Sequence, residues 1–172
     1  MKKAATVFNN KVLYLLFLAL LCRVTAAFMQ PYISKDSTLY VMMAEKIALG
    51  QINESILMCN WIPPLYPYLL ALFASFGLNI ITCAYVTAIL GGLVTVYCIY
   101  LICRQFFCEN TALIALLLAA VHPKLIEYSC KLVRESLYFP LFMLALLCAC
   151  KALSKDTTKP LRLLALAGFL SG

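Results

Sequence analysis

Residues 80–103 read IITCAYVTAILGGLVTVYCIYLIC, a segment without a single charged side chain. As an α-helix this segment would extend about 36 Å at roughly 1.5 Å per residue, more than the roughly 30 Å of a bilayer's hydrocarbon core. Arg104 follows directly, where the helix would reach the membrane surface. A helix satisfies all of its own backbone polar groups, which lipid cannot do. The segment therefore predicts a membrane-spanning helix.

The composition of the whole chain agrees with this interpretation. Hydrophobic residues make up 65% of the 172 positions and charged residues only 12%, and the mean hydropathy is +0.94. Soluble domains contain about 45–50% apolar residues, so these charges are too few to cover a water-exposed surface. The basic residues stand singly or in pairs between apolar blocks and form no stripe with interleaved aromatic residues. Membrane lipid is therefore the expected partner, and nucleic acid is not.

Further apolar blocks lie on both sides of residues 80–103. The block at 65–76 would form only about 18 Å of helix, too short to cross a membrane, and 37–49 reads as an amphipathic helix that ends at Gly50. We expect both to lie at the membrane interface, in the first outer loop. The predicted fold class is an all-α polytopic bundle, one domain over residues 1–172 with spans at about 12–28, 80–103, 110–122, 137–152 and an incomplete one at 161–172.

The distribution of charge predicts the orientation of these spans. With a cytoplasmic N-terminus, the inner segments carry eight basic and two acidic residues, and the outer segments carry six and five. This is the positive-inside bias of multi-pass membrane proteins. Segments 29–62 and 122–136 then share the outer face, where we expect any active site. The chain stops within an apolar run at Gly172, so we interpret it as the N-terminal part of a longer protein.

Asp36 stands at the start of the amphipathic segment, in Ser34-Lys35-Asp36-Ser37-Thr38. In one interpretation it is an N-cap that accepts hydrogen bonds from the first helix amides. In the other it is a carboxylate at the bilayer surface that acts as general base on an acceptor hydroxyl. The two are compatible, because capping also fixes the side chain.

A second charged cluster stands at the start of the span at 137–152. Arg134 and Glu135 lie at its outer end, and Lys131 is three residues before Arg134, which on a helix places both cations on one face. Two such cations can bind a phosphate, although anchoring in lipid headgroups also explains them. Arg23, near the outer end of the first span, either snorkels to the interface or contacts a lipid phosphate at that depth. Cys148 and Cys150 have no nearby histidine and predict no zinc site.

The order of these features resembles the membrane-embedded GT-C glycosyltransferases, in particular protein O-mannosyltransferases and aminoarabinose-transferase-like bacterial enzymes. An aspartate just after the first span is one such feature. The others are the run Asp36…Tyr40…Ala44…Leu49-Gly50, the double proline of Pro63-Pro64-Leu65-Tyr66-Pro67-Tyr68, and His122-Pro123…Tyr128-Ser129…Arg134-Glu135-Ser136.

The resemblance implies a glycosyltransferase that takes a polyprenyl-phosphate-linked sugar and transfers the hexosyl or pentosyl group, with inversion, to a hydroxyl of a lipid, glycan or protein. Asp36 would be the catalytic carboxylate and Glu135 would match the second acidic position. Arg23, Lys131 and Arg134 would bind the donor phosphate. A divalent metal is compatible with this chemistry, but no metal ligands are assigned. We expect a cell-envelope enzyme of a bacterial inner membrane with its active site on the outer face, inactive as residues 1–172 alone.

The alternative is a non-enzymatic polytopic membrane protein, either part of a transporter or an assembly subunit. Transporters place ionisable residues near the bilayer midplane, on broken helices. In this chain nearly all ionisable residues lie at the ends of the predicted spans. The pattern therefore favours chemistry at the membrane surface.

Overall fold

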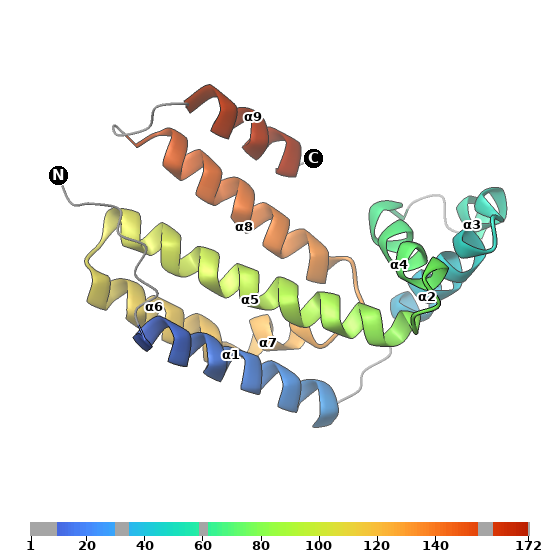
Figure 1. Ribbon diagram of the computed structural model, residues 1–172, viewed down its shortest axis with the longest axis horizontal. Coiled ribbons are helices and arrows are strands. Elements are labelled where there is room, and N and C mark those ends of the chain that lie inside the picture. The colour runs from blue at the N-terminus through green and yellow to red at the C-terminus, as the bar shows by residue number, and fades with distance from the viewer. Residues whose placement is uncertain (1–9, 30–34, 59–61, 155–159, 172) are drawn as a thin grey trace.

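The computed structural model describes residues 10–29, 35–58, 62–154 and 160–171 (Figure 1). These residues contain helices and no β-strand. The helices are α1 (Asn10–Met29), α2 (Lys35–Ala48), α3 (Ile52–Met58), α4 (Leu65–Ser75), α5 (Ile80–Phe106), α6 (Glu109–Val121), α7 (Pro123–Ser129), α8 (Glu135–Ala152) and α9 (Pro160–Ser171).

Helices α1, α5 and α8 are each long and apolar enough to cross a membrane. Helices α6 and α7 meet at a bend of 57°, and together they also have the length and composition of a span. Helices α4 and α9 are apolar but shorter. The predicted class, an all-α polytopic membrane protein, is confirmed.

Helix α5 forms the centre of the molecule (Figure 1). Helix α8 packs along one side of α5 and carries α9 on its outer side, whereas α6 and α1 lie on the opposite side of α5. Helices α2, α3 and α4 form a separate cluster at the end of the bundle where α5 and α8 begin. Of the two segments expected to share one face, 29–62 contains α2 and α3, which lie in this cluster, and 122–136 contains α7, which packs against α5 and α1.

The close contact between α5 and α8 has a local cause in both sequences. Pro140 has no N–H group, so the carbonyl of Ser136, one turn earlier in α8, loses its helical partner. This carbonyl faces Gly91 of α5, where a Cβ atom would lie 2.5 Å from the Ser136 oxygen. Small residues allow helices to approach in this way, and such packing drives helix association in membranes.

Two glycines with positive φ shape the α2–α4 cluster. Gly50 (φ 79°) ends α2 as predicted, with its N–H donating to the Ile47 carbonyl at 3.0 Å. Gly77 (φ 74°) follows α4 and turns the chain toward α5. Asn79 then caps α5 by accepting a hydrogen bond from the Thr82 N–H at 3.0 Å.

The structure corrects two local predictions. Residues 130–134 are not helical, because α7 ends at Ser129 and α8 begins at Glu135, so Lys131 and Arg134 do not share a helix face. Helix α2 begins at Lys35, which places Asp36 in its first turn and not at the N-cap. A carboxylate there still interacts favourably with the positive end of the helix dipole.

Candidate functional site

A groove of about 460 Å³ lies between the start of α4 and the first turns of α8. Arg134 and Glu135 supply its charged groups, and the rest of its wall is apolar or aromatic. The other lining residues are Pro63, Leu65, Tyr66, Leu137, Tyr138, Phe139 and Leu141. The groove thus combines an apolar wall with one charged edge, which suits an amphiphilic ligand.

The charged edge is the junction between residues 130–134 and α8. Arg134 Nε lies 3.4 Å from Glu135 Oε1, and the two side chains are 45% and 37% exposed. A pair this exposed and this long contributes little stability. The contact occupies one edge of the guanidinium, which has five N–H donors in total. Arg134 therefore retains donors for an anionic group.

Lys131 is held by an acidic partner on α7. Its Nζ lies 2.5 Å from Glu127 Oε1, and Lys124 Nζ lies 2.7 Å from Glu127 Oε2. Hydrogen bonds from Lys124 and Lys131 lower the pKa of Glu127 to about 2. Lys131 is absent from the lining of the groove, so a ligand phosphate would engage it only by competing with Glu127.

Glu135 also borders a second, much smaller cavity of about 10 Å³ inside the bundle. Thr95 of α5 and the hydroxyl residues Ser129 and Ser136 line this cavity. That volume is about the minimum for one water molecule. Glu135 therefore borders both the groove and this small cavity.

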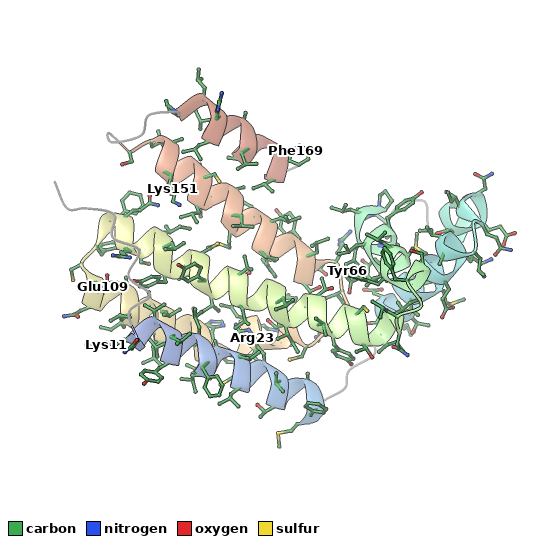
Figure 2. All side chains as sticks on the ribbon, viewed as in Figure 1. Lys11, Arg23, Tyr66, Glu109, Lys151 and Phe169 are labelled. Carbon is green, nitrogen blue, oxygen red and sulfur yellow. The ribbon has the colours of Figure 1, made fainter. Side chains whose placement is uncertain are left out.

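Asp36 does not line the groove. It is exposed, in the first turn of α2, one helical turn before the buried Tyr40. The Tyr40 ring meets the ring of Tyr66 edge-on, with centroids 5.2 Å apart, and Tyr66 lines the groove. Figure 2 shows Tyr66 where α4 approaches the bundle. Burial raises the pKa of Tyr66 to about 12, and its hydroxyl has no hydrogen-bond partner among the described residues.

Arg23 is completely buried, so it does not snorkel to the interface. Its guanidinium donates to the carbonyls of Ala19 and Ala120 and to the hydroxyl of Ser129. Arg23 does not line the groove. The structure therefore brings Arg134 and Glu135 together at the groove, keeps Lys131 nearby on Glu127, and places Arg23 inside the bundle.

Sequence reasoning missed the groove itself and the position of Tyr66 in its wall. The double-proline motif pointed to this region, but no sequence signal pairs Pro63, Leu65 and Tyr66 with the start of α8. Within the described part of the chain, no cluster of three or more His, Cys, Asp or Glu side chains could hold a metal ion. No residue is therefore assigned to a metal.

A comparison with protein families matches residues 62–172 to the family described as dolichyl-phosphate-mannose-protein mannosyltransferase. The match covers more than half of the chain and includes the groove, Lys131, Arg134 and Glu135, whereas Arg23 and Asp36 precede it. Neither a curated protein nor a solved structure matches the chain. The protein is an integral membrane protein, and the resemblance to GT-C glycosyltransferases is confirmed. By this match, the chain belongs to the dolichyl-phosphate-mannose-protein mannosyltransferase family.

Proposed function

We propose that this protein transfers a sugar from a polyprenyl-phosphate-linked donor to an acceptor hydroxyl, with inversion, at the outer membrane face. The observation that carries the proposal is the groove between α4 and α8, which has apolar walls and Arg134 at its edge. A donor of this class has the same two-part chemistry, a long hydrocarbon chain that ends in an anionic phosphate. Membership of a glycosyltransferase family supports the reaction type.

In this proposal the prenyl chain lies along the apolar wall formed by Leu65, Leu137 and Leu141. The phosphate lies at Arg134, because a guanidinium binds phosphate through paired, charge-assisted hydrogen bonds. Lys131 is the second cation, and it reaches the phosphate by releasing Glu127. The burial of Arg23 behind Ser129 argues against direct contact between Arg23 and the donor.

Asp36 is the proposed general base. Its carboxylate accepts the proton of the acceptor hydroxyl as the acceptor oxygen bonds to the anomeric carbon of the sugar. The bond from that carbon to the phosphate oxygen breaks, and polyprenyl phosphate leaves with the electron pair. Glu135, next to Arg134, is proposed to hold the guanidinium and the donor in orientation.

The test compares Asp36→Asn and Arg134→Gln with wild type, each in the full-length protein, in membranes supplied with a radiolabelled polyprenyl-phosphate sugar. We expect Asp36→Asn to abolish transfer while donor binding and membrane insertion persist, because only the base is lost. Arg134→Gln should weaken donor binding, because a charge-assisted phosphate contact is lost. Glu45→Gln, at an exposed position of the same helix α2, is the matched control and should leave transfer unchanged.

Undiminished transfer in Asp36→Asn would remove Asp36 from catalysis. If wild type binds no polyprenyl phosphate and transfers no sugar, the donor assignment fails, and the non-enzymatic alternative replaces it.

A further inference from the structure

We propose that Arg23 is a positioning residue, whose buried guanidinium sets the bend between α6 and α7. Through that bend it places segment 130–135, which carries Lys131, Arg134 and Glu135. The effect on transfer rests on the proposed function, whereas the effect on the bend does not.

Arg23 acts as a clamp through its hydrogen bonds to Ala19, Ala120 and Ser129. The first contact of this clamp is at the end of α6. Helix α6 stops at Val121, just before His122-Pro123, because Pro123 has no N–H group to continue the helical hydrogen bonding. The carbonyls of the last turn of a helix lack partners within it. Arg23 Nη1 donates to one of these, the Ala120 carbonyl, at 3.2 Å, and to its own helix at the Ala19 carbonyl at 3.0 Å. The guanidinium thus ties α1 to the end of α6.

The second contact is at the far end of α7. Arg23 Nε donates to Ser129 Oγ at 3.2 Å, and Cys130 Sγ donates to the Arg23 carbonyl at 3.3 Å. Ser129 is the last residue of α7, and its hydroxyl also donates to the Leu125 carbonyl at 2.7 Å. One residue of α1 therefore contacts the chain both before and after α7, on either side of the 57° bend.

Gly92 of α5 packs directly against the Arg23 guanidinium and the Ser129 hydroxyl. A Cβ atom there would overlap Ser129 Oγ and lie 2.7 Å from Arg23 Nε. Figure 2 shows Arg23 in the centre of the bundle, near α1, α5 and α7. Only a residue without a side chain leaves room for the guanidinium and the serine hydroxyl together.

The cost of this arrangement indicates a role beyond packing. A fully buried guanidinium loses its hydration, and Arg23 Nη2 has no hydrogen-bond partner among the described residues. Apolar residues of similar volume often replace buried charges without loss of stability. An apolar side chain, however, cannot join Ala120 to Ser129. The forked guanidinium reaches both, and the single amine of lysine does not reproduce that geometry.

The experiment measures the bend directly. Spin labels at positions 21 (α1) and 126 (α7) report the direction of α7, and a second pair at 21 and 114 reports α6 as a reference. Native cysteines are removed, with Cys130 replaced by serine to retain a donor to the Arg23 carbonyl. In the full-length protein, wild type is compared with Arg23→Met, Arg23→Lys and Ser129→Ala, the last of which removes one clamp contact with minimal loss of volume. Arg104→Met, near the C-terminal end of α5, is the control substitution of another arginine.

We expect the distance between positions 21 and 126 to shift or broaden in Arg23→Met and Ser129→Ala, with the distance between 21 and 114 unchanged. Transfer should fall on the order of 100-fold in Arg23→Met, the cost of misplacing reacting groups by about 1 Å. Arg23→Lys should restore neither the wild-type distance between positions 21 and 126 nor wild-type transfer. Arg104→Met should leave both that distance and transfer unchanged. If Arg23→Met does not insert, Ser129→Ala carries the test alone.

An unchanged distance between positions 21 and 126 in both variants would overturn the clamp. Lost transfer with an intact bend would assign Arg23 to the donor directly, and a changed bend with full transfer would remove its positioning role. Failure of the proposed function is recognised separately, because wild type itself would then transfer no sugar while the bend still shifted in Arg23→Met.

Discussion

Of the two glycines in α5, Gly92 is the one at which an added Cβ atom would lie nearest to a neighbouring atom. Substitution by alanine would force its methyl group against Ser129 Oγ and Arg23 Nε, which are hydrogen-bonded to each other. Ser129 Oγ is also held by its hydrogen bond to the Leu125 carbonyl. We expect Gly92→Ala to destabilise the protein by roughly 1–3 kcal/mol, a typical cost of overpacking. Thermal unfolding in detergent measures this change.

Gly168 of α9 supplies the matched control for Gly92, because a Cβ atom there would meet nothing within 4 Å. Gly168→Ala should be neutral or slightly stabilising, since alanine favours a helix over glycine by up to about 1 kcal/mol. Equal destabilisation in both variants would contradict the close contact at Gly92.

Glu127 links pH to the ordering of α7. Its folded pKa of about 2 is depressed below the ordinary 4.5 by Lys124 and Lys131, so its ion pairs contribute fully above the ordinary value. That contribution is lost as the pH falls from about 4.5 through 2. The stability difference between wild type and Glu127→Gln should therefore shrink over this window, in unfolding curves recorded at each pH. Because the pairs are exposed, the difference should be small and should weaken with salt. A difference independent of pH would show that the pairs do not form.

At the scale of secondary-structure elements, α4 is a helix of 11 residues with no charged side chain. Tyr66, Leu70 and Ala71 pack into the core with α2, whereas Leu65, Tyr68, Leu72 and Phe76 are exposed along or just beyond the helix. An apolar helix too short to span is expected to lie in the membrane interface.

Spin labels at positions 68 and 72 should therefore be accessible to oxygen and protected from a water-soluble nickel complex. A label at position 45 of α2, on a charged and exposed side chain, should show the opposite preference. Accessibility of positions 68 and 72 to the nickel complex would place α4 in water.

The pairing of α5 with α8 depends on Gly91 and Pro140. A Cβ atom at Gly91 would meet the Ser136 carbonyl at 2.5 Å and the Pro140 ring at 3.1 Å, and a backbone carbonyl cannot rotate away as a side chain can. We expect Gly91→Ala to destabilise the protein by at least as much as Gly92→Ala. The labelled distance between α5 and α8 should increase in this variant. An unchanged distance and stability would show that the two helices do not approach this closely.

At the scale of the whole molecule, the groove and Asp36 must face the same side of the membrane for the proposed reaction. Single cysteines at positions 36 and 135, in a background without native cysteines, are probed with an impermeant reagent from each side. We expect both to be labelled from outside, as the distribution of basic residues predicts. Labelling from opposite sides would separate the two carboxylates and end the proposed site.

The sequence by itself determined the fold class and most of the helices. Long uncharged segments such as 80–103 have one solution in lipid, a helix, because every backbone polar group must be satisfied within the segment. Gly50 ends α2 as predicted, since glycine adopts positive φ without strain. The order of motifs also identified the family, because it depends on residue types and spacing alone.

Only the tertiary structure decided how these helices combine. Arg23 looked like an interfacial cation, but α5, α6 and α7 surround it, and no local pattern in α1 records those neighbours. The break at 130–134 separated Lys131 from Arg134, and Glu127 took Lys131 as its partner. The groove arose because the start of α4 and the start of α8, about seventy residues apart, meet at one end of the bundle. Contacts between distant segments depend on packing in three dimensions, and periodicity along the chain does not encode them.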